Sequence, residues 1–190
     1  MDEGLSVQGC LDEWIVKSHS LFNVISKNDF DIKLSESLTI TLPNNLDYLF
    51  DSINKAKYIL ALESNWDDEG AEKYDSITLE KAINFIITFA DWISKSNHST
   101  MYVPKILHGP DKSIDVLWEE EDFRLIINVE KEGQKSSFYF DNGKDLSQFI
   151  EGTFEIQTCN FKFIPTPTKS KWSLSCREYK KQTFFILTRS

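Results

Sequence analysis

The sequence predicts an α+β fold in which a helical hairpin packs on an antiparallel β-sheet, with additional strands near the N- and C-terminal ends. Apolar residues recur every three or four positions over residues 44–95, which is typical of helices. Over residues 101–143 they alternate with polar residues, as in strands with one buried face. A sheet with one apolar face needs a cover, and the preceding helices supply it. We expect residues 1–190 to form a single domain.

Residues 1–43 are expected to hold a short helix followed by strands. The segment LDEWIVKSHSLFNVI, at 11–25, has apolar residues at roughly helical spacing. In FDIKLSESLTITLP, at 30–43, apolar and polar residues alternate, which predicts two short strands or one bent strand. The apolar positions are Phe30, Ile32, Leu34, Leu38, Ile40 and Leu42.

Residues 44–95 are expected to form the helical hairpin. The first helix should begin behind Pro43 and Asn44 and reach about Ser64. The second should begin near Asp75 or Ser76, because either side chain can accept a hydrogen bond from the free N–H groups of a first turn. Apolar residues lie on more than one side of this second helix, so we expect it to be the central element of the core.

Within residues 101–143 the alternation predicts three antiparallel strands, at 114–118, 123–129 and 138–140. The segments between them, EEED and EKEGQK, are charged or contain glycine and have the length of hairpin turns. Residues 144–151 are expected to form a short helix or turn. Residues 153–190 return to strand-like runs, which either extend the same sheet or pair with the N-terminal strands.

Composition narrows the classes of function. Thirty acidic and 21 basic residues give a formal net charge of −9, so the average field repels phosphate groups. We therefore expect no direct binding of nucleic acid or of an anionic membrane, and a protein partner with a basic surface instead. Cys10, Cys159 and Cys176 are widely spaced, which argues against a disulfide framework or a zinc ribbon. The acidic start MDEGLSVQGC and the lack of long apolar runs favour a cytoplasmic protein.

The most distinctive segment is LESNWDDEGAEKYDS, residues 62–76, which joins the two predicted helices. We interpret it first as a structural loop. Asn65 in the left-handed conformation would close the first helix, and Trp66 would fold back onto the core. Asp67 and Asp68 would accept hydrogen bonds from backbone N–H groups of the turn. The prediction of a non-enzymatic protein depends on this buried Trp66 ring, with the acidic neighbours serving as scaffold and contact surface.

Two other interpretations of this loop stay open. Asn65, Asp67, Glu69 and Gly70 match the first six positions of an EF-hand loop, but Ser76 stands where a bidentate glutamate is needed. Alternatively, the acids are exposed and bind a basic patch on a partner, with Trp66 as an aromatic anchor.

The stretch NWDDEGAEKYDSITLEKAINFI resembles a motif of uncharacterised bacterial and phage proteins, in which Asn-Trp-Asp-Gly-Tyr-Gly-Ala lies between two helices. The resemblance covers residues 55–141, and Asp68 and Glu69 replace the usual Gly-Tyr, which makes this loop more acidic. It implies no activity. It implies a small accessory protein of a mobile element or defence locus. The function that we predict is a non-enzymatic acidic protein-interaction module, such as an accessory, antitoxin, immunity-like or phage-defence protein.

A second acidic run, EEED at 119–122, follows Trp118 at a predicted hairpin tip. Such a run is usually a solvated turn. Together with the first loop it could form a single acidic face that recruits a cationic partner or imitates nucleic acid. The candidate partner surface is therefore Trp66, Asp67, Asp68, Glu69, Glu119, Glu120, Glu121 and Asp122.

Signals for catalysis are weak. His19, His98 and His108 lack the spacing of zinc ligands, and the chain has neither a Gly-x-Ser-x-Gly elbow nor a nucleotide-binding glycine loop, so we expect no cofactor. Pro110 and Asp111 resemble the start of a nuclease pattern that the next strand does not complete. The alternative function is a metal-dependent hydrolase or nuclease of unrecognised type, with clustered carboxylates as ligands: Asp67, Asp115 and Glu119.

Overall fold

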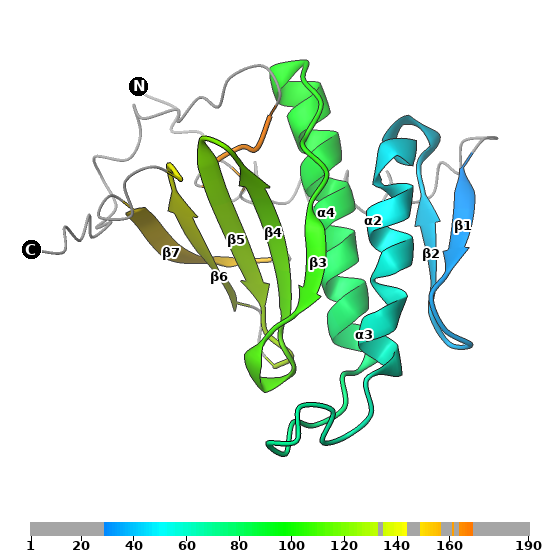
Figure 1. The fold of residues 1–190 in the computed structure, drawn as a ribbon. Coiled ribbons are helices and arrows are strands. Elements are labelled where there is room, and N and C mark those ends of the chain that lie inside the picture. The colour runs from blue at the N-terminus through cyan, green and yellow to red at the C-terminus, as the bar shows by residue number, and fades with distance from the viewer. Residues whose placement is uncertain (1–28, 133–134, 144–148, 157–160, 162–163, 169–190) are drawn as a thin grey trace, which may run out of the picture.

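The computed structural model describes residues 29–132, 135–143, 149–156, 161 and 164–168. These residues form the predicted α+β fold, with helices packed on an antiparallel sheet. Figure 1 shows the sheet beside helix α4, with α2 and α3 next to α4 and a small β-hairpin outermost. The predicted helix at 11–25 lies outside the described residues.

The outermost hairpin consists of β1 (Phe30–Lys33) and β2 (Thr39–Leu42), which pair antiparallel. Ile32 and Ile40 are register partners, and both are buried. Of the two predicted alternatives, two short strands or one bent strand, the structure has the first. The residues alternate because each strand has one face against the helices and one in solvent.

The first predicted helix is a series of shorter helices. A 3-10 helix, η1 (Asn44–Leu49), leads into α2 (Phe50–Lys55), and α3 (Lys57–Ala61) follows after a break at Ala56. The prediction of one helix reaching Ser64 is therefore wrong. At the break, the Ala56 N–H bonds the Ile53 carbonyl and the Ile59 N–H bonds the Ala56 carbonyl, both at 3.1 Å. These i→i+3 bonds tighten the turn while the apolar stripe stays buried.

Helix α4 (Ser76–Asn97) begins where the sequence predicts. Asp75 is its N-cap, and the Asp75 Oδ1 accepts the Thr78 N–H at 2.8 Å. His98 ends it in the left-handed conformation, with φ of 48°. Ten residues of α4 are buried, which confirms that this helix is the central element of the core.

The sheet has five antiparallel strands in the order β3-β4-β5-β6-β7. The predicted three strands correspond to β4 (Ile114–Glu120), β5 (Phe123–Val129) and β6 (Lys135–Asp141). Strand β3 (Lys105–His108) was not predicted, because its two apolar residues, Ile106 and Leu107, are adjacent and show no alternation. Strand β7 (Phe149–Glu155) extends the sheet and includes residues 149–151, so the helix or turn predicted there is wrong. The strands predicted beyond residue 168 lie outside the described residues.

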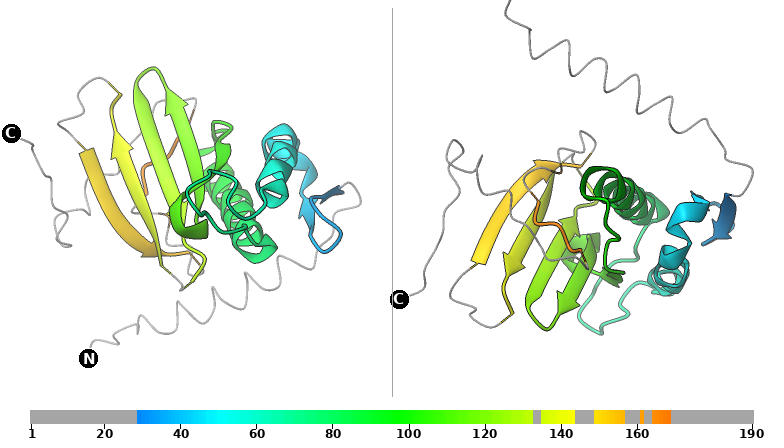
Figure 2. Two further views of the ribbon diagram at one scale, coloured as in Figure 1. Left: turned by 60° about the horizontal axis from the view of Figure 1, so that its bottom comes forward. Right: turned by 90° about the horizontal axis from the view of Figure 1, so that it is seen from above.

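The helices of the described chain cover one face of the sheet (Figure 2). Val116, Trp118, Leu125 and Ile127 point to this face and are buried. The other face carries the alternate residues, including an ion pair between Arg124 and Asp141. No helix in the described ranges is long and apolar enough to cross a membrane.

Candidate functional site

The loop between α3 and α4 is held by hydrogen bonds from its own side chains. The Asp67 Oδ1 accepts the backbone N–H groups of Glu69 and Ala71, at 2.9 and 3.0 Å. The Asn65 Oδ1 accepts the Gly70 N–H at 2.8 Å. The two bonds to Asp67 lower the pKa of its carboxyl, because they favour the charged form. The predicted role of Asp67 as an acceptor within the turn is confirmed.

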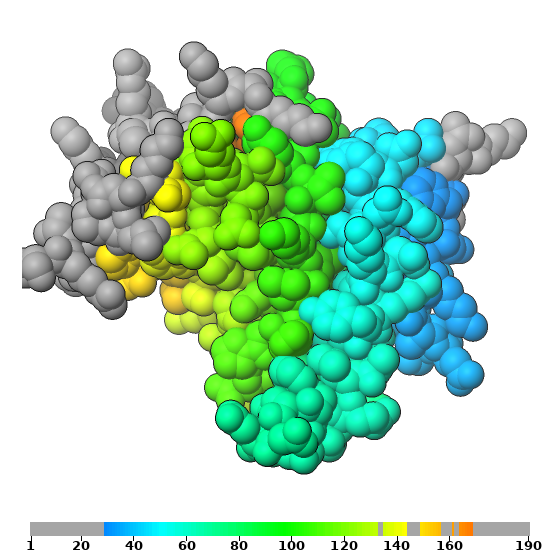
Figure 3. All heavy atoms as spheres, viewed as in Figure 1, coloured from blue at the N-terminus to red at the C-terminus, as the bar shows by residue number. Residues whose placement is uncertain are grey.

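Asn65 has the predicted left-handed conformation, with φ of 64°, but it does not close the first helix. That helix ends at Ala61, and the backbone is already extended at Leu62. The chain therefore leaves the helices earlier than predicted and reaches toward the turn between β3 and β4. Figure 3 shows the atoms of the loop against those of this turn at the lower end of the molecule.

Trp66 is not part of the core, so the prediction of a buried ring is wrong. Its side chain is 36% exposed. The ring instead lies edge-on to His108, with 4.6 Å between centroids, and 6.5 Å from the Tyr74 ring. The case for an inert scaffold rested on a buried indole and loses that support. The exposed ring is available to a ligand or a partner.

Trp66 belongs to an aromatic cluster that joins α3, the loop and β3. The Tyr58 hydroxyl accepts the backbone N–H of His108 at 3.3 Å and lies 3.1 Å from the His108 Nδ1. The Tyr74 hydroxyl donates to the Gly109 carbonyl. Burial raises the pKa of Tyr74, which keeps this donor protonated.

A pocket of about 990 Å³ lies between this loop, the β3–β4 turn and the end of β5. Trp66, Tyr74 and His108 contribute rings to its lining. We call it the Trp66 pocket. Its lining includes seven acidic residues: Asp67, Glu69, Glu72, Asp111, Asp115, Glu130 and Glu132.

Two lysines also line the Trp66 pocket, and each is already paired. Lys112 forms an ion pair with Glu72, and the Lys131 Nζ lies 3.6 Å from an Asp75 carboxylate oxygen. The hydrogen bond from Lys112 lowers the pKa of Glu72, and the same bond raises the pKa of Lys112. Among the described residues, Glu69 and Glu132 form no salt bridge. The pocket therefore has a negative surface.

Asp115 lies in a polar network within this pocket. The Asn128 Nδ2 donates to the Asp115 Oδ1 at 2.6 Å and to the Ser113 Oγ at 2.7 Å. Burial raises the pKa of Asp115, while the Asn128 hydrogen bond and the charge of His108 oppose that effect.

Gly109 leaves the space that the network needs. A Cβ atom there would lie 2.4 Å from the Ser113 Oγ and 3.1 Å from the Asp115 Oδ1. Sequence reasoning missed this network, since it named Asp115 only as a metal ligand. The signal was the glycine in HGPDKSID, between the unpredicted strand β3 and a predicted strand.

The carboxylates proposed as metal ligands do not meet. Asp67 and Asp115 line the Trp66 pocket, but Glu119 does not and pairs with Lys105 at 3.1 Å. No group of three or more His, Cys, Asp or Glu side chains in the described part of the chain could hold a metal ion. The oxygens of Asn65 and Asp67 that match EF-hand positions accept backbone N–H groups instead.

The two acidic runs lie at opposite ends of the sheet. Asp115, at the start of β4, lines the Trp66 pocket, whereas Glu119–Asp122 follow at the end of β4 and in its turn to β5. A strand of this length spans about 20 Å. In Figure 1 the loop is at the bottom and the β4–β5 turn at the top. The hypothesis of one acidic face that combines Asp67–Glu69 with Glu119–Asp122 is therefore wrong.

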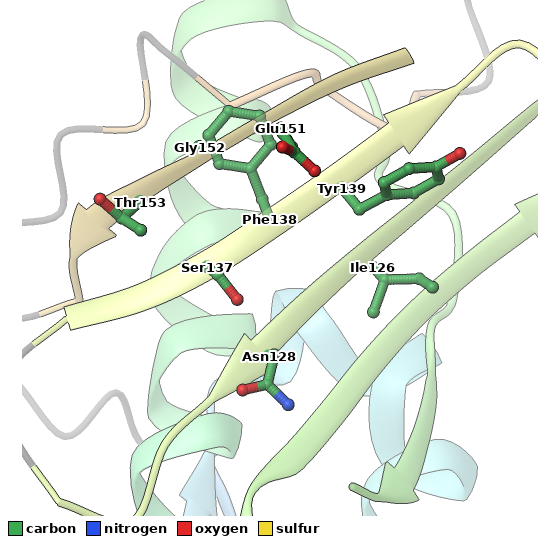
Figure 4. Close-up of a pocket in the computed structure, with 8 residues that line it drawn as sticks. All are labelled: Ile126, Asn128, Ser137, Phe138, Tyr139, Glu151, Gly152 and Thr153. Carbon is green, nitrogen blue, oxygen red and sulfur yellow. The ribbon is translucent and has the colours of Figure 1, made fainter. Parts of the chain in front are cut away.

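A second, smaller hollow of about 340 Å³ lies on the outer face of the sheet, over β5, β6 and β7 (Figure 4). Asn128 and Ser137 are register partners there, and Glu151 is the acidic residue of its lining. Asn128 lines both hollows, so the two are neighbours on this face of the sheet. The smaller hollow lacks the charge and the exposed indole of the Trp66 pocket, which makes the latter the stronger candidate site.

Comparison of the chain with protein-family models, with curated proteins and with solved structures finds no match. The function must therefore be argued from the geometry and chemistry of the site.

Proposed function

We propose that this protein is an interaction module that binds a basic protein partner, and that the partner docks in the Trp66 pocket. One observation carries the proposal. Seven carboxylates and an exposed indole line a single pocket, and both of its lysines are paired with carboxylates. A basic surface would relieve the repulsion among these acids on binding.

Trp66 is suited to anchor such a partner. Tryptophan is enriched among the residues that contribute most to binding at protein interfaces. Here the partly exposed indole lines the pocket, on a loop whose shape is held by the Asn65 and Asp67 side chains. Binding would therefore cost little ordering of the loop backbone.

The charge of the whole chain acts in the same direction. A net charge of −9 attracts a basic protein over longer distances and speeds the encounter. The pocket then provides the local complementarity that selects the partner. Toxin–antitoxin pairs and phage-defence complexes are the first place to search for it, because the loop resembles a motif of bacterial and phage proteins.

The test compares two charge reversals of equal size. Glu69→Lys with Glu132→Lys changes the Trp66 pocket, and Glu120→Lys with Glu121→Lys changes the β4–β5 turn. The partner that copurifies with the wild-type chain is identified, produced separately and titrated against both variants by calorimetry. We expect the pocket variant to bind at least tenfold more weakly and the turn variant to bind within about threefold of wild type, since a tenfold change is about 1.4 kcal/mol.

Four results would overturn the proposal. Equal losses in both variants would mean that only total charge matters. A loss confined to the turn variant would place docking at the β4–β5 turn. A copurifying partner without a basic surface, or unchanged binding in both variants, would remove the electrostatic basis of the proposal.

A further inference from the structure

The outer face of the sheet contains a carboxylate that is already neutralised by an arginine. The Asp141 side chain is fully buried, and its Oδ2 accepts hydrogen bonds from the Arg124 Nε and Nη2, at 3.0 and 2.7 Å. The guanidinium of Arg124 lies 5.7 Å from the centroid of the Tyr139 ring. In this arrangement a sheet carboxylate is paired with an arginine that also contacts an aromatic ring.

Asp115 is the counterpart that forms no salt bridge in the described ranges, although the charge of His108 also acts on it. Its carboxylate is partly buried, and in the described ranges its hydrogen-bond donor is the neutral amide of Asn128, on Oδ1. The two lysines of the pocket pair with Glu72 and Asp75 instead. A partly buried carboxylate outside any salt bridge is costly, and a cation brought into direct contact with it recovers part of that cost.

The rings that would accompany such a cation are also present. Trp66, Tyr74 and His108 line the same pocket as Asp115, and Trp66 is exposed. A cation in this pocket would therefore contact a carboxylate and an aromatic ring, as Arg124 contacts Asp141 and Tyr139.

We propose that the pocket receives an arginine side chain of the partner, whose guanidinium pairs with the carboxylate of Asp115 and lies against the Trp66 ring. Asp115 is then the residue that selects arginine. This inference rests on the proposed function and names the chemistry of the partner at the same site.

Arginine is favoured over lysine for geometric reasons. A guanidinium is planar, so it can stack on an indole while it donates two parallel hydrogen bonds to a carboxylate. It is also more weakly hydrated than an ammonium group, so moving it into a partly buried pocket costs less. Asn128 fixes the Asp115 Oδ1, and Gly109 leaves room for the carboxylate.

The experiment uses the full chain and a defined probe. Nα-acetyl-arginine amide is titrated into isotope-labelled protein, and NMR follows the indole N–H of Trp66 and the side-chain amide of Asn128. The citrulline analogue has the same shape without the charge, and the lysine analogue has the charge without the plane. Asp115→Asn removes the carboxylate, and Asp51→Asn, on the exposed side of α2, is the matched control.

We expect the arginine probe to shift both signals in wild type and in Asp51→Asn with the same affinity. Asp115→Asn should weaken binding at least tenfold, as should citrulline in place of arginine, and lysine should bind several-fold more weakly than arginine. The spectrum of Asp115→Asn in the absence of probe verifies that the variant is folded. If this variant does not fold, Trp66→Ala replaces it and should produce the same loss.

The inference is overturned if Asp115→Asn binds arginine as wild type does, if citrulline binds equally well, or if the probe leaves both signals unchanged. After any of these outcomes the proposed function still stands if the Glu69→Lys and Glu132→Lys variant binds the basic partner more weakly than wild type. Conversely, the arginine probe could bind at Asp115 while the charge reversal of Glu69 and Glu132 leaves partner binding unchanged. That result would contradict the proposed function alone.

Discussion

Two tryptophans in this chain are each followed by a run of acids, and the structure uses them in opposite ways. Trp118, before Glu119–Asp122, is 1% exposed; its Nε1–H donates to the Tyr102 carbonyl at 2.9 Å and its ring packs edge-on against Phe89. Trp66, before Asp67–Glu69, is 36% exposed and lines a pocket.

The difference follows from the backbone on which each ring stands. Trp118 lies within β4, where alternate residues face α4, so its side is set by strand geometry. Trp66 lies in a loop, where no regular side-chain alternation decides whether its ring faces the core or the solvent. The direction of the ring depends on where the loop packs against the rest of the molecule. Two similar local sequences, each a tryptophan followed by acids, therefore place their rings differently: Trp118 lies in the core and Trp66 lies on a candidate binding surface.

The largest expected effect separates the two rings by stability. Trp118→Ala should lower the free energy of unfolding by about 3–5 kcal/mol, because it leaves a cavity in the core and removes the bond to Tyr102. Trp66→Ala should lower it by less than about 1 kcal/mol, since this side chain is partly in solvent. Urea denaturation of both variants measures the difference. Similar losses for the two variants would mean that Trp66 is also a core residue.

The second prediction compares the pH dependence of two aspartates near the Trp66 pocket. The folded-state pKa of Asp115 is raised above its ordinary 3.8 by burial, so its contribution to stability is complete below that value and is lost as pH rises through the folded pKa. For Asp75, burial is outweighed by hydrogen bonds from Thr78 and by Lys131, so its pKa is lowered. Its contribution is present above 3.8 and is lost as pH falls through the folded pKa.

Asparagine variants test these signs, because Asn keeps the shape of both side chains and also caps helices well. Relative to wild type, Asp115→Asn should gain stability as pH rises above 3.8. Relative to wild type, Asp75→Asn should lose stability as pH rises toward 3.8 from below, because only the wild-type chain gains the contribution of the ionised carboxylate. Unfolding free energies between pH 2.5 and 7 measure both slopes. Slopes of the same sign would contradict the different environments assigned to the two carboxylates.

The smallest expected effect is local to the loop. Asp67→Ala removes the acceptor of the Glu69 and Ala71 N–H groups, so hydrogen exchange at these two amides should become faster. Asp68→Asn is the control, because no hydrogen bond to the Asp68 side chain holds the turn in the described residues and Asn tolerates the φ of 60° at this position. Equal exchange in the two variants would show that Asp67 does not hold the turn.

The sequence was informative wherever residues alternate or recur along an element. Strands β4, β5 and β6 and the start of α4 were predicted because side-chain period and capping chemistry are local properties. Hydrogen bonding by Asp67 was predicted for the same reason. Strands β3 and β7 were missed or misassigned, because a strand without alternation and an edge strand with Gly152 depend on pairing with neighbours.

By itself, the sequence determined the fold class, the central helix, the acidic character and the turn chemistry of the loop, since each depends on residues close together in the chain. Only the tertiary structure decided that Trp66 is exposed, that the two acidic runs lie at opposite ends of the sheet, and that Asp115 and Asn128 lie in the pocket with the loop. These are contacts between distant segments. They are set by how the whole apolar core packs, which local patterns do not encode.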